Sequence, residues 1–422
     1  MAKAALYTIF RCTNYGAVLQ AFALARTMRG ILGEDSVDVV NHRMDPRDTH
    51  LLGKITNPNT PWFQRWRNRR KFAARYFRPD LFEARRAKTV ALIEREVRPT
   101  ERLYASPDEL RGLPAYATVV VGSDQVWNPL LNTDFGRNQY LATDLPDGQD
   151  RVAYAASFGV SEIPESLRGE YAAALGRFRR ITVREETGAA ICESLLGRRP
   201  PVVLDPTMLL SADEWRAAIA RRGASAAEGP CAAAYWVRSV TQADVDALAA
   251  FARARGLPVR LMSAGPLPKL AFPKEVVPFV DADPFEFVSA MADSSAVVTD
   301  SFHGLQFSTV FGKPFVALGS LSDPKSNASR LVDFCARYGL SGGVQDIERF
   351  RAGAELEPAD FSSFDSSAFS ADRVRSAGEL KSLLRRAFPS ERANPGSDEA
   401  CPQRASLKNQ GRGACGAGWE LV

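Results

Sequence analysis

The sequence predicts an α/β protein with two Rossmann-like, doubly wound domains and a cleft between them. Short, almost continuous apolar runs alternate with segments of helical periodicity, which is typical of parallel strands that helices cover on both faces. This alternation stops at a stretch of small and turn-forming residues at 221–230 and then begins again. The chain has 422 residues, which is long for a single domain and natural for two.

The first half, residues 1–215, is expected to form the N-terminal domain. It opens with an apolar strand and a turn, after which apolar residues recur at helical spacing in 17–32. Its predicted strands lie at 4–9, 36–41, 118–121, 151–157, 180–184 and 201–204. Residues from about 43 to 115 are helical in pattern and highly charged, and we expect them to form an insert.

The second half, residues 225–385, repeats the alternation and is expected to form the C-terminal domain. Its predicted strands lie at 231–237, 259–262, 296–298 and 315–318. Its predicted helices lie at 243–254, 284–292, 305–311 and 330–338, and Pro284 suits the first position of a helix. The tail at 389–422 is rich in Gly, Ser, Asn and charged residues, a composition typical of disorder.

The composition argues against several classes of protein. Apolar residues make up 45% and charged residues 24% of the chain, as in ordinary soluble globular proteins. Neither a run of about 18 apolar residues nor a signal peptide is visible, so we expect a cytoplasmic protein. The net charge of +5 is too small to indicate a nucleic-acid partner. The six cysteines include no CxxC pair and no dinucleotide fingerprint is present, so we expect neither a metal site nor a cofactor.

The strongest local signal follows the predicted strand at 296–298. The polar residues Asp300 and Ser301 lead into His303 and Gly304, where a helix begins. Free backbone N–H groups at a helix start bind anions, and a histidine there can bind phosphate or donate a proton near neutral pH. We therefore interpret His303 as a candidate catalytic residue. The alternative is a histidine that caps the helix or packs in the core.

Polar residues also follow strands of the first half. One group comes after the strand at 118–121, and its members are Ser123, Asp124, Gln125 and Asn128. The alternative for this group is a turn in which Asp and Asn form local hydrogen bonds. Another group, at the first helix, comprises Asn14, Tyr15 and Gly16. Because ligands of doubly wound sheets lie outside the carboxyl ends of the strands, we expect both groups in the cleft.

Arg184 ends the predicted strand at 180–184. An arginine at this place can bind a carboxylate with two parallel hydrogen bonds, which makes it a candidate ligand for an anionic substrate. The alternative is a surface arginine in a salt bridge.

Several of these residues belong to segments that resemble the polysaccharide pyruvyl transferase family. The segments occur in order at 14–20 (NYGAVLQ), 122–128 (GSDQVWN), 157–159 (SFG), 204–207 (LDPT) and 299–304 (TDSFHG), and are followed by Phe307-Ser308, 313–315 (KPF) and Ser329-Arg330. The resemblance extends over about residues 5–340. Many members carry Arg-Leu-His where this chain has Ser301-Phe302-His303, so an arginine that would contact the donor is absent here.

The resemblance implies a GT-B-like fold and a transferase that moves a pyruvyl group from phosphoenolpyruvate to a sugar of a cell-surface polysaccharide or its precursor, forming a ketal. On this basis we predict that His303 is the general acid or a phosphate ligand and that Asp300 orients it. The donor is expected to bind Arg184, Ser301, Gly304, Lys325 and Arg330. The acceptor, a sugar or a lipid-linked oligosaccharide, is expected near Asn14, Tyr15, Gly16, Ser123, Asp124, Gln125, Asn128 and Ser157.

Two alternatives stay open. A glycosyltransferase with a nucleotide-sugar donor fits the same architecture, since a fold does not determine a function. A non-enzymatic membrane-surface module fits residues 62–78, where aromatic and basic residues interleave. A solvated helix with a packed aromatic face is the plainer interpretation of that segment, and nucleic-acid binding is the least favoured.

The same segment also predicts peripheral contact of the enzyme with the anionic inner face of the membrane. In that case Trp62, Trp66 and Phe77 would enter the headgroup layer, while the phosphates would contact Arg65, Arg69 and Arg70.

Overall fold

The computed structural model describes residues 2–42, 61–131, 134–222, 229–322, 328–340 and 342–388. Residues up to Phe388 form one compact unit. The expectations for 43–60, for Lys325 and for the tail at 389–422 lie outside the described residues.

The first sheet is parallel and lies in the N-terminal half. Its strands are β1 (Ala4–Tyr7), β2 (Val37–Val39), β3 (Thr118–Val121), β4 (Arg151–Ala156) and β5 (Arg180–Val183), in the order β2-β1-β3-β4-β5. All residues of β1, β3 and β4 are buried, as their continuous apolar runs predict for a sheet covered on both faces. The strand order changes direction between β1 and β3, which is where such sheets bind ligands.

The helices of this half are α1 (Tyr15–Leu32), α6 (Asp134–Tyr140), α7 (Glu165–Gly176), α8 (Glu186–Leu196) and α9 (Ala212–Ala220). The prediction of a strand at 201–204 is wrong, because only Val202 in this segment pairs with β5, and it does so through a single isolated bridge. A short 3-10 helix, Pro206–Met208, follows it, since proline cannot extend a ladder of hydrogen bonds.

The second sheet is also parallel. Its strands are β6 (Ala232–Trp236), β7 (Val259–Ser263), β8 (Val276–Pro278), β9 (Ala296–Thr299), β10 (Phe315–Gly319) and β11 (Val344–Asp346), in the order β11-β10-β9-β6-β7-β8. Its helices are α10 (Gln242–Arg255), α11 (Pro284–Asp293), α12 (Phe302–Phe311), α13 (Ala328–Arg337) and α14 (Ile347–Arg351). The strand order is that of a Rossmann sheet, with its switch point between β6 and β9. The predicted fold class, with two Rossmann-like doubly wound sheets, is confirmed.

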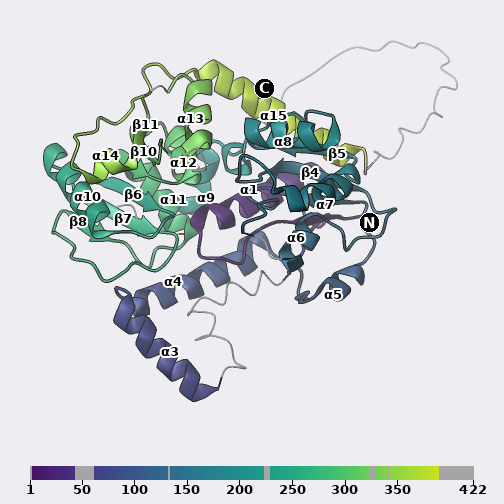
Figure 1. The fold of residues 1–422 in the computed structure, drawn as a ribbon, viewed down its shortest axis with the longest axis horizontal. Coiled ribbons are helices and arrows are strands. Elements are labelled where there is room, and N and C mark those ends of the chain that lie inside the picture. Colours follow the sequence, from purple (N-terminus) through teal and green to yellow (C-terminus); the bar gives the residue numbers. More distant parts are fainter. Residues whose placement is uncertain are drawn as a thin grey trace, which may run out of the picture. The chain divides into compact units, whose positions relative to one another are not determined.

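The last described helix, α15 (Ser366–Arg385), runs from α13 of the second half across to β5 of the first sheet (Figure 1). Its Glu379 forms an ion pair of 2.6 Å with Arg180 of β5, and the Ser376 hydroxyl accepts a hydrogen bond of 2.9 Å from the Leu204 amide. Residues 366–385 therefore contact the N-terminal sheet, which a boundary drawn at 225–385 does not anticipate.

The two sheets share a hydrophobic core formed by the helices between them. Trp215 of α9 is fully buried, and its ring lies 5.7 Å from that of Phe22 in α1 and 5.2 Å from that of Phe307 in α12. Tyr15 of α1 stacks on Phe287 of α11 at 4.7 Å. These contacts join residues from both halves, so the sheets are packed against each other through one core.

The charged insert is helical, as predicted, over its described part. It contains α3 (Trp62–Arg75), α4 (Pro79–Leu92), a π-helical turn (Ile93–Val97) and α5 (Pro107–Arg111). Arg85 of α4 is buried and donates to the carbonyl oxygens of Ser263 at 2.6 Å and Ala264 at 3.1 Å, and also to that of Thr13. One insert side chain therefore ties the loop after β1 to the end of β7. Among the described helices, none is long and apolar enough to span a bilayer.

Candidate active site

The predicted polar residues lie at the switch points of the two sheets. Asn14 follows β1 and caps α1, accepting a hydrogen bond of 3.0 Å from the Gly16 amide and one of 3.1 Å from the Tyr235 hydroxyl of β6. Ser123 follows β3, and His303 lies in the first turn of α12 after β9. The carboxyl ends of both sheets therefore contribute to one site, as expected for doubly wound sheets.

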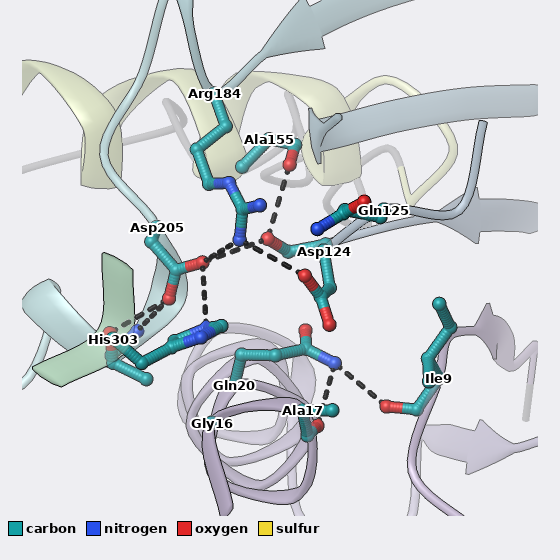
Figure 2. Close-up of polar contacts among 12 residues, drawn as sticks. Ile9, Gly16, Ala17, Gln20, Asp124, Gln125, Ala155, Arg184, Asp205 and His303 are labelled. Atoms are coloured by element: carbon teal, nitrogen blue, oxygen red, sulfur yellow. Dashed lines mark hydrogen bonds and ion pairs between the residues drawn. The ribbon is translucent and has the colours of Figure 1, made fainter. Parts of the chain in front are cut away.

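His303 faces a carboxylate, but that carboxylate is Asp205 (Figure 2). The Nε2 atom of His303 lies 3.6 Å from Oδ2 of Asp205. Asp205 is fully buried and accepts hydrogen bonds from the Thr207 amide at 2.9 Å and the Ser123 hydroxyl at 3.3 Å. Burial alone would raise the pKa of Asp205, but His303 and Arg184 outweigh it and hold that pKa well below its usual range. Asp205 is therefore a fixed negative charge that can orient His303.

The prediction that Asp300 orients His303 is wrong. The Asp300 carboxylate accepts from the backbone amides of Val237 at 2.6 Å and Arg238 at 3.1 Å, and it pairs with the Arg238 guanidinium at 3.0 Å. Burial raises the pKa of Asp300 despite these contacts. Asp300 therefore fastens the ends of β6 and β9 to each other, because free amides at strand ends attract a carboxylate.

Ser301 and Gly304 shape the start of α12. The Ser301 hydroxyl caps the helix by accepting from the Gly304 amide at 3.3 Å, so this amide already has a partner and is not free for an anion. A side chain at Gly304 would collide with Thr299, and one at Gly16 would collide with the His303 ring. Two glycines thus allow α12 to lie against β9 and His303 to lie against α1.

Arg184 is the centre of a buried ion cluster rather than a free cation. Figure 2 shows its guanidinium between two carboxylates: Nη1 lies 2.9 Å from Asp205 and 3.3 Å from Asp124. Nε lies 3.6 Å from Glu185. Burial lowers the pKa of Arg184, but the three carboxylates outweigh this effect and raise it above its usual value. The positive charge of Arg184 is therefore already balanced by the protein.

Arg330, in contrast, is a buried guanidinium without a counter-ion. It is 8% exposed, its Nε has no hydrogen-bond partner, and no ion pair joins it to a described residue. Its guanidinium lies 5.8 Å from the ring of Phe302, and that of Arg184 lies 5.3 Å from the same ring. Burial, with a smaller effect of Arg184, lowers the pKa of Arg330 from its ordinary value. A buried donor of this kind is suited to an anionic ligand.

Both arginines line a cavity of about 450 Å³. Its charged lining residues are Arg184, Arg330, Arg337 and Arg375 together with Glu185, Glu186, Asp205 and Asp333. Four arginines and four carboxylates balance each other formally. The lining therefore has no net charge that would attract an anion. An anion in this cavity would be bound by an individual side-chain donor that has no ionic partner among the described residues.

The other predicted acceptor residues differ in burial and in hydrogen bonding. Tyr15 is fully buried in the shared core and does not reach a cleft, which corrects its assignment. Gln125 and Asn128 hydrogen-bond to each other at 2.6 Å. Ser157 is fully buried, and its hydroxyl has no hydrogen-bond partner among the described residues. Lys325 lies outside the described residues.

Asp205 and Glu185 are the site residues that sequence reasoning missed. Asp205 was part of the 204–207 segment but carried no role, and Glu185 directly follows Arg184. Both Glu185 carboxylate oxygens are buried without a hydrogen-bond partner. Nε2 of His303 and Nε2 of Gln306 are also buried without a hydrogen-bond partner among the described residues, since the distance from His303 to Asp205 exceeds that of a hydrogen bond. In the described part of the chain, no cluster of three His, Cys, Asp or Glu residues is arranged to hold a metal ion.

Comparisons with known proteins gave matches to solved structures and to one family model. One solved structure that the chain resembles is a UDP-GlcNAc 2-epimerase from Neisseria meningitidis bound to UDP-GlcNAc, at 9% identity and a TM-score of 0.44, with 92% of this chain and 100% of that chain covered. Another is the ADP-heptose lps heptosyltransferase II of E. coli, at 13% identity and a TM-score of 0.36, covering 92% and 99% of the two chains. At these identities the likeness concerns the fold alone. No curated protein sequence matches the chain.

A family model gives the stronger result. The model described as polysaccharide pyruvyl transferase matches residues 14–322, which include His303, Asp205 and Arg184. The GT-B-like fold expected for that family is present as two Rossmann-like parallel sheets. Because the match covers most of the chain and contains the motifs that build the site, this protein belongs to the polysaccharide pyruvyl transferase family.

Proposed function

We propose that the protein transfers a pyruvyl group from phosphoenolpyruvate to a sugar of a cell-surface polysaccharide or its precursor, such as an exopolysaccharide or a lipid-linked oligosaccharide, and forms a cyclic ketal. The observation that carries the proposal is the buried Arg330, which forms no ion pair with a described residue and lines the same cavity as Asp205. Asp205 in turn lies 3.6 Å from His303. Phosphoenolpyruvate offers a carboxylate and a phosphate, the two groups that a guanidinium binds with paired hydrogen bonds.

In this mechanism His303 is the general acid. It donates a proton to the methylene carbon of phosphoenolpyruvate, and positive charge develops at C2. A sugar hydroxyl attacks C2 and gives its proton to the now neutral His303. A second hydroxyl of the same sugar then displaces phosphate, which leaves with the proton of that hydroxyl, and the ketal closes. The fixed carboxylate of Asp205, 3.6 Å from Nε2, orients the imidazole of His303 for the transfer.

Arg330, rather than Arg184, is the residue that we assign to the donor. The charge of Arg184 is matched by Asp205, Asp124 and Glu185, whereas Arg330 has no acidic partner among the described residues. An arginine from α13 thus takes the role that the missing arginine before Phe302 would have had. The family's donor chemistry is then compatible with Ser301 at that position.

Replacing Arg330 by Gln is expected to weaken binding of phosphoenolpyruvate by about tenfold to a hundredfold, because a charge-assisted hydrogen bond is lost. Calorimetric titration of the full chain with phosphoenolpyruvate measures this effect. Arg216→Gln is the matched control, since that half-exposed arginine lies outside the cavity. Equal affinities in all three proteins would remove Arg330 from the donor site.

A donor screen tests the reaction itself. The protein is incubated with candidate sugars and either phosphoenolpyruvate or nucleotide sugars, and products are identified by mass spectrometry. We expect products that have gained a pyruvyl ketal, together with released phosphate. Products that have instead gained a sugar residue would identify a nucleotide-sugar glycosyltransferase.

We further propose that helix α3 binds anionic membrane surfaces. The N-terminal end of this helix carries three exposed aromatic side chains. The exposed fractions are 74% for Trp62, 51% for Phe63 and 57% for Trp66. The helix carries five arginines, one lysine and no acidic residue. In Figure 1, α3 extends away from both sheets, so its aromatic end is free of them. Aromatic side chains flanked by cations favour the headgroup layer of an anionic bilayer.

The structure corrects two details of the sequence-based expectation for this segment. The helix ends at Arg75, and Arg78 has a left-handed backbone, so 62–78 is not one helix. Phe77 packs on Phe272 at 4.9 Å, and its amide donates to the Leu267 carbonyl at 2.8 Å, so it does not belong to the membrane-facing group.

The double substitution Trp62→Ser, Trp66→Ser is expected to abolish most co-sedimentation with vesicles that contain anionic lipids. Neutral vesicles should not bind the wild-type protein, and added salt should weaken its binding to anionic vesicles, because each basic residue contributes only about 1 kcal/mol at the surface. Val374→Ser, at an equally exposed apolar residue (74%), is the control. Binding unchanged by the tryptophan substitutions contradicts the proposal, and a change of oligomeric state without lipid would show that α3 contacts a second copy.

A further inference from the structure

A second cavity lies at the other end of β5 from the active site. Arg180 begins β5 and lines this cavity, whereas Arg184 directly follows β5 and lines the active-site cavity. The second cavity has a volume of about 320 Å³. We call it the arginine pocket, because its charged lining residues are Arg179, Arg180, Arg198, Arg199 and Arg386.

The charge of the arginine pocket distinguishes it from the active-site cavity. Its lining contains five arginines and no aspartate or glutamate, all of them within the described part of the chain. The active-site cavity, by contrast, has equal numbers of arginines and carboxylates. Carboxylates just outside the lining pair with Arg179, Arg180 and Arg199, so the unbalanced positive charge that attracts anions to the arginine pocket lies on Arg198 and Arg386.

Ion pairs outside the lining hold three of these arginines in place. Arg179 pairs with Asp150 at 2.7 and 3.1 Å, Arg180 with Glu379 at 2.6 Å, and Arg199 with two glutamates of α8 at 2.7 and 2.9 Å. Each of these arginines has five N–H donors, and the ion pairs use only some of them. The Nη1 of Arg179 and the Nε of Arg180 are buried and have no acceptor.

The remaining two arginines are less restrained. Arg198 donates one hydrogen bond of 3.1 Å to the Phe178 carbonyl. Arg386 forms no side-chain hydrogen bond or ion pair with a described residue, and both residues are exposed. Their guanidinium groups are therefore available to a ligand at the mouth of the pocket.

We propose that the arginine pocket binds a small molecule that carries at least two phosphate groups. Guanidinium groups recognise phosphate oxygens through paired, charge-assisted hydrogen bonds, and five of them exceed what one phosphate can use. The volume lies within the range of ligand sites. The lining also includes Ile181, Leu196, Pro200 and Pro201, which suit the uncharged part of such a molecule. This site is distinct from the one proposed for the pyruvyl donor.

A purely structural explanation covers only part of the cluster. Arg198 and Arg199 follow the end of α8, and Arg386 follows the end of α15, where cations stabilise a helix without any ligand. Arg179 likewise lies three residues after the end of α7, whereas Arg180 is the first residue of β5 and belongs to no helix terminus. The convergence of residues from three helix ends and one strand on a single cavity points to an anion.

Calorimetric titration of the full chain with inorganic pyrophosphate tests the proposal, with orthophosphate as the comparison. We expect pyrophosphate to bind more tightly than orthophosphate. The double substitution Arg198→Gln, Arg386→Gln should weaken pyrophosphate binding by about tenfold or more. Because both residues are exposed, thermal unfolding without ligand should be unchanged. The control Arg253→Gln removes an arginine of similar exposure from α10, outside either cavity, and should bind as the wild type does.

Arg330→Gln separates this site from the donor site. It should leave pyrophosphate binding intact, because Arg330 does not line the arginine pocket. If Arg330→Gln abolishes pyrophosphate binding while Arg198→Gln, Arg386→Gln does not, the anion occupies the active-site cavity and the inference falls. Absence of pyrophosphate binding at millimolar concentration also overturns it. Neither result bears on whether phosphoenolpyruvate is the donor.

Discussion

Replacing His303 by Ala should lower the rate of pyruvyl transfer by about 10²–10⁴-fold, the usual effect of removing a general acid. The protein should remain folded, because Asp205 keeps its contacts with Arg184, Ser123 and Thr207. The rate is measured as phosphate released from phosphoenolpyruvate in the presence of an acceptor sugar, and folding is checked by circular dichroism. Turnover close to that of the wild type in a folded variant would exclude His303 from the mechanism.

Two aspartate substitutions test which carboxylate orients His303. Asp205→Asn removes the negative charge 3.6 Å from His303 and should lower kcat strongly, since the imidazole loses the carboxylate that orients it. Asp300→Asn leaves one acceptor oxygen for the amides of Val237 and Arg238, and because these contacts do not involve His303, the substitution should lower kcat much less than Asp205→Asn. Equal losses in both variants would contradict the assignment of Asp205 as the partner of His303.

Replacing Arg184 by Met should lower the free energy of unfolding by about 3–5 kcal/mol, the cost of leaving buried charges without their partner. The side chain of Arg184 is 1% exposed, and those of Asp205, Asp124 and Glu185 are 0%, 12% and 4% exposed. Methionine has a similar length, so the loss of stability comes mainly from the three uncompensated carboxylates. Denaturant titration of the wild-type and variant chains measures the difference.

Arg168→Met is the matched control for Arg184. Its partly exposed guanidinium lies 3.6 Å from an exposed Glu165, and the loss of such a surface pair changes stability by less than about 1 kcal/mol. If Arg184→Met is as stable as this control, the cluster around Arg184 does not hold the first sheet together. Low stability of Arg184→Met would also explain a loss of activity in that variant without any contact to the donor.

The main strands and helices were predictable because their apolar residues recur with the period of the element. The strands β3, β6 and β10 are buried along their whole length, and their apolar runs are plain in the sequence. The edge strands β8 and β11 were missed, since each has three residues and no continuous buried pattern. The start of α12 was placed at Leu305 by periodicity, whereas the cap at Ser301 begins the helix at Phe302.

The sequence by itself determined the two Rossmann-like halves and the position of His303 at a strand end, because periodicity and motif order are local properties. Only the tertiary structure decided which carboxylate faces His303. Asp300 is nearest along the chain but bonds to the amides after β6, whereas Asp205 reaches His303 from the other half. The structure likewise showed that carboxylates neutralise Arg184, whereas Arg330 forms no ion pair with any described residue. The ionic partners of a buried charge come from segments distant in sequence, and packing alone brings them together.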